Sequence, residues 1–459
     1  MPGSLGATES SLSARRILAL WWPLAASWML MGVELPLFTA CVARMAEPEV
    51  NLAAYGSLVF PLALVIEAPI MMLLAAATAL ASDAQAWGRV WRFMHKASAC
   101  LTAVHALIAF TPLFDLLAHQ VFEVPLEVVE PARLGLRLML PWTWSIAYRR
   151  THQGLLIRHE RGRPVVLGSF VRLAANAAVY SAAFALQRAG YPVPGIAAGA
   201  SAVACGVLSE AAFIGFCTRR LLRDHPLPAS GVAELTRAGF LRFYVPLALT
   251  PLIALVTQPI GAAAMARMRE PLESLAAWPG VHGLLFLVRA GGFAFNEVVV
   301  SLLGRPDAAP ALRRFGLRLG LVSSAVLCGV AFTPLAGLWF GGVSGLAPGL
   351  SAAAASAVGL AAFWPLLQAL QSWFQGALVH HRRTRQVTES MGVFFVVVTT
   401  ALALGVYATQ ATGLAWAVGS LVLASLAQTG WLAWRLHTSA RAEGSAGEIS
   451  SGSDRDAGA

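Results

Sequence analysis

Ionisable side chains are rare in the long apolar stretches of this sequence, and the few that occur there are its best candidates for chemistry. A charged side chain at the centre of a lipid bilayer costs roughly 2.5–3.5 kcal/mol, so such groups are kept mainly where they line a polar pathway or pair with one another. The ionisable residues within or at the ends of apolar stretches are Glu34, Glu67, His105, Asp115, Arg172, Glu210, Arg289 and Glu297.

The acidic members of this set favour ion coupling. Glu34 lies between Pro23 and Pro36, and Glu67 precedes Pro69. Proline removes a backbone donor and loosens the helix beside it. A carboxyl group at such a distortion suits proton or sodium coupling, but it could instead stay protonated and hydrogen-bond a neighbour. The predicted coupling or gating residues are Glu34, Glu67, Glu297 and His105.

Three of the ionisable residues also have simpler explanations. His105 could titrate near neutral pH, but a single histidine in an apolar stretch is more often a hydrogen-bonded packing group. Asp115 and Glu210 lie toward the ends of their apolar stretches and could simply be hydrated.

The basic and amide residues favour anion binding. Arg289, Phe293 and Asn296 are spaced by four and seven residues and so share one helical face. The planar guanidinium group of arginine suits carboxylate or phosphate, although Arg289 could instead form a structural ion pair with Glu67 or Glu297. Arg172 and Asn176 share a face in the same way. The predicted substrate-binding residues are Arg289, Phe293, Asn296, Arg172, Asn176 and Gln258.

The sequence contains no motif for catalysis or for a resident metal. It has no P-loop, no GxSxG, no HExxH and no paired Cys/His ligands. The five cysteines are not in CxxC spacing and are expected to be small apolar packing residues. We therefore expect no enzyme and no cofactor, and any transport would be driven by a proton or sodium gradient or by the solute's own gradient.

The elements that must position these residues are membrane-spanning helices. Of the 459 residues, 57% are hydrophobic and only 12% are charged, and the mean hydropathy is +0.66. A span needs roughly 20 apolar residues. The sequence predicts an all-α integral membrane protein with spans near 17–43, 51–81, 97–119, 134–156, 164–187, 193–217, 240–266, 274–303, 316–340, 350–379, 387–409 and 412–434.

The net charge of +10 is explained by membrane topology rather than by nucleic acid. Most Lys and Arg residues, Arg149 and Arg150 among them, fall in alternate connections and at the two ends. This pattern predicts that the protein lies in a cell membrane or inner membrane with both termini on the cytoplasmic side. The basic clusters at 158–163 and 382–385 are expected to anchor the chain at lipid headgroups.

An internal repeat divides the chain into two halves of six spans. The segment 43–55 (ARMAEPEVNLAAY) aligns without gaps on 266–278 (ARMREPLESLAAW), and eight of the thirteen residues are identical. Farther along, Gln153-Gly154 aligns with Gln375-Gly376 at a spacing one residue shorter. The predicted parts are a cytoplasmic N-terminus (1–16), an N-lobe (17–222), a cytoplasmic linker (223–239), a C-lobe (240–438) and a disordered cytoplasmic tail (439–459).

Two parallel repeats of this kind typically enclose a transport site between them. The region equivalent to Glu34 is Thr257-Gln258-Pro259, which is polar but uncharged, so the two halves are chemically unequal. A non-transporting scaffold that arose by duplication is the alternative interpretation.

The chain resembles the multidrug, oligosaccharide-lipid and polysaccharide exporter superfamily, which has the MATE-type fold. Within it, local stretches are similar to the progressive ankylosis family, in a bacterial-type form. The residues that carry the resemblance are 151–159 (THQGLLIRH), 105–111 (HALIAFT), 52–56 (LAAYG), 246–249 (PLAL), and the acids Glu34 and Glu297.

That resemblance implies a secondary-active exporter of small organic or phosphate-bearing anions, such as pyrophosphate, nucleotides or citrate, that works by alternating access between the lobes. Its expected partners are the anion and membrane lipids, and a monomer is expected. Two alternatives share the fold: a proton- or sodium-coupled exporter of cationic drugs, and a flippase for lipid-linked precursors.

Overall fold

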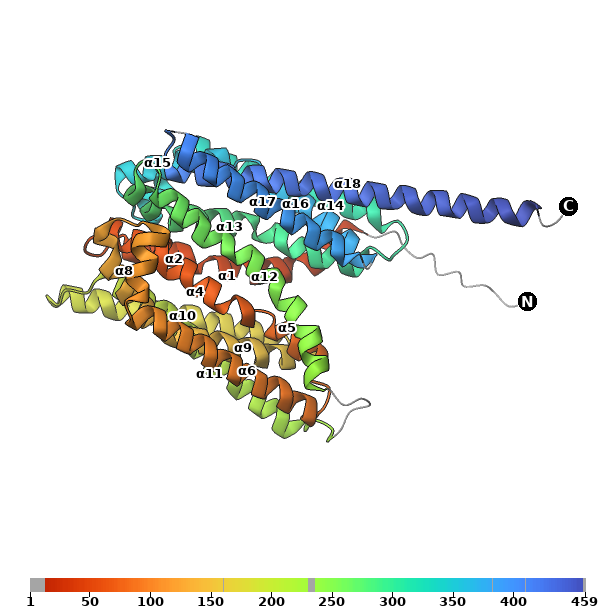
Figure 1. Ribbon diagram of the computed structural model, residues 1–459, viewed down its shortest axis with the longest axis horizontal. Helices are drawn as coiled ribbons and strands as arrows, with labels where there is room; N and C mark the ends of the chain where they lie inside the picture. Colours follow the sequence, from red (N-terminus) through yellow and green to blue (C-terminus); the bar gives the residue numbers. More distant parts are fainter. Residues whose placement is uncertain (1–12, 160, 230–235, 382, 409, 457–459) are drawn as a thin grey trace.

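The structure is a computed structural model that describes residues 13–159, 161–229, 236–381, 383–408 and 410–456. Residues 1–12 of the predicted N-terminal segment and 230–235 of the predicted linker therefore lie outside the described residues. The described chain is almost entirely helical, and its helices form two lobes (Figure 1). The prediction of an all-α fold with two six-span lobes is confirmed.

The first half of the chain begins with two broken spans and continues through longer helices that are joined by short segments. Its elements are α1 (Ala14–Gly32), α2 (Glu34–Val42), α3 (Pro48–Ala54), η1 (Tyr55–Val59), α4 (Phe60–Glu67), η2 (Ala68–Ile70), α5 (Leu73–Leu80), α6 (Ala84–Phe110), α7 (Leu113–Leu116), η3 (Leu117–Phe122), α8 (Leu126–Leu138), α9 (Leu140–Arg158), α10 (Arg163–Arg188) and α11 (Gly195–Asp224).

The second half repeats the pattern with fewer breaks. Its elements are α12 (Arg237–Ala266), α13 (Pro271–Leu302), α14 (Ala308–Phe332), η4 (Gly337–Val343), α15 (Pro348–Leu360), α16 (Trp364–His380), α17 (Thr384–Ala408) and α18 (Gly413–Asp456). In the described residues, nine helices are long and apolar enough to cross a bilayer, and the bent pair α15–α16 makes a tenth. The α8–α9 pair and α12 occupy the two other predicted spans.

Two predicted spans are shifted toward the N-terminus. The third ends at Phe110 rather than 119, and the ninth ends at Phe332 rather than 340. Thr111 and Thr333, which follow these helices, are extended, with φ of −120° and −126°. Each precedes a proline, which disfavours the helical conformation at the residue before it. The chain after each break forms a separate short π-helical segment, η3 or η4.

The repeat is visible in the conformation of the chain. Glu47 and Glu270 both adopt a left-handed conformation before a proline that starts the next helix. Just beyond, the side chains of Asn51 and Ser274 accept hydrogen bonds from the backbone N–H groups of Ile196 and Leu414 at 2.9 and 3.1 Å. Equivalent positions therefore hold equivalent helix starts in the two lobes.

A π-helical turn explains the one-residue change in the repeat spacing. The segment η1, Tyr55–Val59, is π-helical, whereas the aligned part of α13 is regular α-helix. A π-type bulge accommodates one residue more than an α turn does. After this extra residue, Glu67 in the N-lobe is equivalent to Arg289 in the C-lobe. The two lobes thus carry opposite charges at the same place in their second spans.

The first helix of each half packs on the opposite half. In α1, Trp21 Nε1 donates a hydrogen bond of 2.8 Å to the Gly291 carbonyl in α13. In α12, the hydroxyl of Tyr244, which is equivalent to Trp21, donates one of 2.6 Å to the Pro69 carbonyl. Figure 1 shows the two helices crossing between the lobes, which meet near α8 and α15 and diverge where α12 begins. Each half of the chain therefore contributes its first helix to the contact between the lobes.

The recurring Gln-Gly pair lets two helices approach closely in each lobe. A Cβ at Gly154 would lie 2.4 Å from the Leu74 carbonyl oxygen, and one at Gly376 would lie 2.7 Å from Val299 Cβ. Gly154→Ala and Gly376→Ala should each destabilise the protein by about 1–3 kcal/mol through overpacking. Gly392→Ala is the matched control, because its Cβ would meet nothing within 4 Å. Thermal unfolding in detergent measures all three, and equal Tm values for the three variants would contradict this packing.

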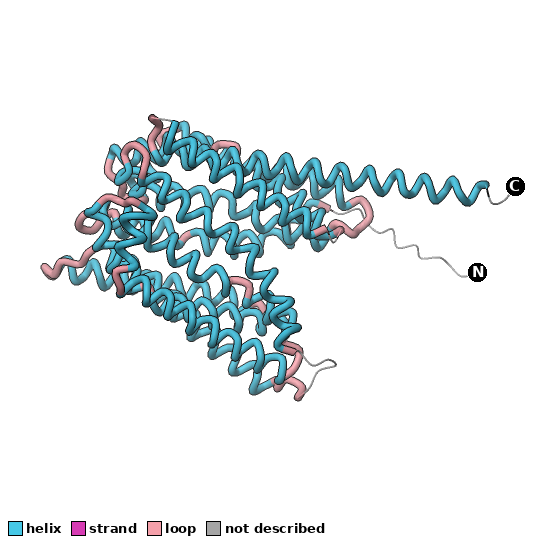
Figure 2. The backbone as a smooth tube through the Cα atoms, in the orientation of Figure 1, coloured by secondary structure: helices cyan, strands magenta, loops and turns pink. Residues whose placement is uncertain are grey.

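The last helix continues into the C-terminal tail. The backbone of α18 is helical through Asp456, well beyond the end of the last predicted span at 434. Extending an existing helix costs much less than nucleating one, so a polar tail of Ser, Gly, Ala and charged residues can continue the last span. Figure 2 shows the tail as a helix that projects away from the lobes.

Candidate functional site

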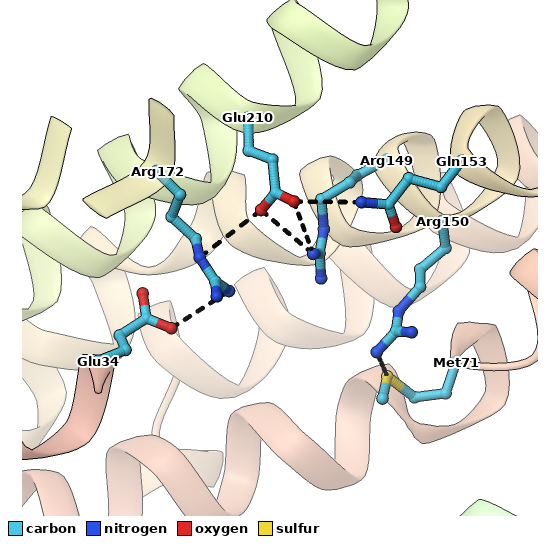
Figure 3. A network of polar contacts seen from close by, with 7 residues as sticks. All are labelled: Glu34, Met71, Arg149, Arg150, Gln153, Arg172 and Glu210. Atoms are coloured by element: carbon cyan, nitrogen blue, oxygen red, sulfur yellow. Dashed lines mark hydrogen bonds and ion pairs between the residues drawn. The ribbon is translucent and has the colours of Figure 1, made fainter. Parts of the chain in front are cut away.

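The N-lobe holds a chain of buried charges contributed by four helices. Arg172 in α10 lies between two acids: its Nη1 is 3.2 Å from Glu34 Oε2, and its Nε is 3.6 Å from Glu210 Oε2. Glu34 opens α2 directly after the break at Val33, and its side chain is 20% exposed, whereas that of Glu210 in α11 is fully buried. Arg172 therefore links a solvent-accessible carboxylate to a buried one (Figure 3).

Glu210 is the centre of this network. Both of its oxygens lie 3.1 Å from Nη1 of Arg149, and Gln153 Nε2 donates to Oε1 at 3.1 Å. Arg149 and Gln153 are four residues apart on α9 and so share a face. Burying a carboxylate away from water costs free energy, and charged hydrogen-bond donors offset that cost only while they stay in contact with it.

Arg150 is the cation of the N-lobe network with the weakest described partner. Its Nη2 lies 3.8 Å from the sulfur of Met71, and its Nε has no hydrogen-bond partner among the described residues. Glu67, which is 2% exposed, also has a carboxylate oxygen without a described partner. The region beside α4 and α9 therefore holds a donor and an acceptor with no described partner.

Asn176 joins the network, and His105 does not. Asn176 Nδ2 donates to Glu34 Oε1 at 3.0 Å, and its Oδ1 has no described partner. Both ring nitrogens of His105 are engaged, with Thr143 Oγ1 at 2.9 Å and the Leu136 carbonyl at 2.8 Å. This arrangement is the one expected of a packing histidine, the alternative considered for His105.

The C-lobe holds a second polar centre around Arg289 in α13. Its Nη2 donates to Gln368 Oε1 at 2.5 Å, and its guanidinium carbon lies 3.8 Å from the centre of the Trp364 ring and 5.2 Å from that of Phe293. Among the described residues, no carboxylate lies within 4.0 Å of Arg289. The structural ion pair with Glu67 or Glu297 is therefore not observed in the described part of the chain.

The remaining predicted residues surround the same part of α13. Asn296 Nδ2 donates to the Ser372 carbonyl at 3.5 Å, while Glu297 is exposed. Gln258 of α12 contacts His282 Nε2 at 3.4 Å. The predicted residues thus fall into two groups, one in each lobe, rather than into one cluster.

Several residues of these centres were missed or misjudged from sequence. Arg149 and Arg150 were counted with the loop charges, but α9 continues to Arg158 and carries both inside the lobe. Glu210, expected at a hydrated end, is fully buried, whereas Asp115 is 43% exposed and pairs with Arg133. The recurrence of Gln153 at Gln375 is a sequence pattern that could have marked α9 as part of the site. No such pattern marks Gln368 or Trp364, the neighbours of Arg289.

A separate crevice on the C-lobe does not involve either centre. It is lined mainly by apolar residues of α14, α16 and α18, with Arg313 and His437 as its charged or titratable members. None of the predicted site residues lines it.

Comparison with known proteins identifies the fold as that of MATE-type transporters of the MOP superfamily. An inward-facing MATE multidrug-resistance transporter matches with a TM-score of 0.65 at 14% identity over 92% of this chain and 98% of that one. A MOP superfamily transporter from Pyrococcus furiosus, described as having a binding pocket of reverse polarity, gives a TM-score of 0.63 at 15% identity over 94% of this chain and 99% of that one. The lipid II flippase MurJ, in an inward closed conformation, gives 0.68 at 10% over 91% and 87%.

No protein-family model and no curated protein matches the chain. With its many apolar helices and this fold, the chain is an integral membrane protein. Identities of 10–15% establish the architecture alone.

Proposed function

We propose that this protein is a secondary-active exporter of small organic or phosphate-bearing anions, of the pyrophosphate, nucleotide or citrate class, that works by alternating access. The observation that carries the proposal is Arg289. It is a guanidinium at span depth that contacts two aromatic rings and an amide, with no described carboxylate within 4.0 Å. An anionic solute would supply the missing counter-charge, and arginine binds carboxylate and phosphate in bidentate geometry.

The N-lobe network supplies a route for coupling to a proton or sodium gradient. Glu34 is its accessible acid, and Arg172 connects it to Glu210. Neutralising or occupying Glu34 would leave Arg172 with only one of its two acidic partners, so ion binding and the packing of α2 against α10 are linked. The fold supports a transport role, because solved structures that share it include a multidrug-resistance transporter and a lipid II flippase.

The orientation and assembly of the exporter follow from the same proposal. The bias of positive charge favours both termini on the cytoplasmic side of a cell membrane or inner membrane. The end at which the lobes diverge then faces the cytoplasm. Because the polar centres lie inside one chain, a monomer suffices for transport.

A reconstituted transport assay tests the proposal. Proteoliposomes are loaded in parallel with citrate, ATP, pyrophosphate or the cation ethidium, and release is followed with and without a proton or sodium gradient. We expect release of at least one anion and no protein-dependent release of ethidium. Release of ethidium alone, abolished by Glu34→Gln, would establish the cation-exporter alternative instead. Translocation of a lipid-linked pyrophosphate alone would establish the flippase, and failure of every solute to cross would point to a scaffold.

A further inference from the structure

Two arginines related by the repeat reach across the lobes at the end where the lobes meet. Arg44 follows α2, and its equivalent Arg267 follows α12. Each uses Nη1 to hydrogen-bond the helix that precedes it, at the Ala40 carbonyl (2.6 Å) and the Ala263 carbonyl (3.0 Å). Each guanidinium is thereby fixed to its own half with its second nitrogen free to reach outward.

The second nitrogen of each arginine binds the opposite half. Arg44 Nη2 donates to the Gly342 carbonyl at 2.6 Å, in η4 of the C-lobe. Arg267 Nη2 donates to the Val121 carbonyl at 2.7 Å, in η3 of the N-lobe, and to Glu123 Oε1 at 2.8 Å. The two contacts therefore join corresponding segments of the two halves, and the Arg267 contact also includes a carboxylate.

The receiving segments are built to accept these contacts. Both η3 and η4 are π-helical turns, and the chain leaves them through left-handed residues, Glu123 (φ 52°) and Gly345 (φ 72°). A Cβ at Gly345 would lie 2.8 Å from Arg44 Nη1, so glycine satisfies both the backbone conformation and the close approach of the guanidinium. Carbonyl groups at the end of a helix lack intrahelical donors and are available to such cations.

We propose that Arg44 and Arg267 form a paired latch that holds this end of the two lobes closed and must release for the opposite conformation to form. Each guanidinium hydrogen-bonds a helix of its own half and a segment of the opposite half, so losing both should shift the balance between closed and open forms. The Arg267 half also includes the carboxylate of Glu123, whose side chain is 53% exposed, so this half should weaken as salt increases.

The latch is tested by measuring the distance between the lobes directly. Spin labels are placed at Tyr191→Cys and Tyr407→Cys in a background without the five native cysteines. Both residues are exposed, and they belong to opposite halves: Tyr191 lies between α10 and α11, and Tyr407 lies in the last turn of α17. Pulsed electron–electron double resonance in nanodiscs then compares the distance between the two labels in the parent and in Arg44→Ala/Arg267→Ala. We expect the ratio of long to short distances to rise about tenfold or more in the double variant, and less in either single variant.

Arg269→Ala is the matched control. Arg269 is two residues from Arg267, and its Nη1 hydrogen-bonds the Gln410 carbonyl of its own half at 3.2 Å, so its loss should leave the distances unchanged. Superimposable distance distributions for the parent, Arg269→Ala and the double variant, all monodisperse by gel filtration, would overturn the latch.

The role of the latch in a transport cycle rests on the proposed function, but the distance measurement does not. If the double variant opens while no solute crosses proteoliposomes, the latch stands and the proposed function fails. If solutes cross while the distances stay unchanged, the latch fails and the proposed function stands.

Discussion

Glu210→Gln should lower the free energy of unfolding by about 3–5 kcal/mol, the cost of removing one partner from a buried ion pair. Glu210 is fully buried and faces Arg149 and Arg172. Glutamine keeps the shape and can still accept from Gln153, but it cannot compensate two cations. The expected result is a large drop in Tm in detergent and in the denaturant midpoint.

Asp224→Asn is the control for this substitution. Asp224 pairs with Arg220 and Arg223 at the end of α11, where its side chain is 52% exposed, and exposed pairs contribute only about 0–1 kcal/mol. We also expect Glu210→Gln/Arg149→Gln to recover part of the loss, because it removes one of the uncompensated cations. Equal Tm values for Glu210→Gln and Asp224→Asn would show that the network is not a buried electrostatic unit.

Arg289→Ala should reduce anion export by roughly ten- to a hundredfold, which corresponds to the loss of one or two charge-assisted hydrogen bonds. Arg289→Lys should recover little of this activity, because an ammonium cannot stack on Trp364 or bind an anion in bidentate geometry. Initial rates of export from proteoliposomes measure both variants over a range of anion concentrations.

Two controls separate binding from folding at this site. Arg318→Ala removes an exposed arginine of α14 and should leave export unchanged. Gln368→Leu removes the hydrogen-bond partner of Arg289 but leaves its charge, so it should weaken export less than Arg289→Ala does. Wild-type rates in a folded Arg289→Ala protein would remove this residue from the substrate site.

The helical architecture was predictable because its signals are local. Apolar stretches long enough to cross a bilayer, the bias of positive charge and the repeat around Met45 and Met268 each belong to one region of sequence. Hydropathy alone predicts that the third and ninth spans continue to 119 and 340, but the helices end at Phe110 and Phe332, directly before Thr-Pro pairs. Those prolines set the backbone conformation whatever the surrounding hydropathy.

The partners within the site were less predictable because they depend on distances between helices. Sequence selected Glu34, Arg172 and Arg289 by their cost in an apolar stretch, but it could not show that Arg172 lies between Glu34 and Glu210. It also misplaced Arg149, because a charge near the end of a span looks the same whether it faces headgroups or a buried acid. The aromatic ring over Arg289 comes from α16, a helix far away in sequence.

The most direct test of alternating access is the side from which Phe293→Cys can be labelled. Phe293 is partly buried and lies beside Arg289, so a thiol there reports on the proposed pathway. In a background without native cysteines, a membrane-impermeant maleimide is applied to sealed vesicles of each orientation. We predict labelling from the side of the termini in the parent, and from the opposite side once Arg44 and Arg267 are both replaced by alanine. A thiol that reacts from neither side in either protein would contradict the account.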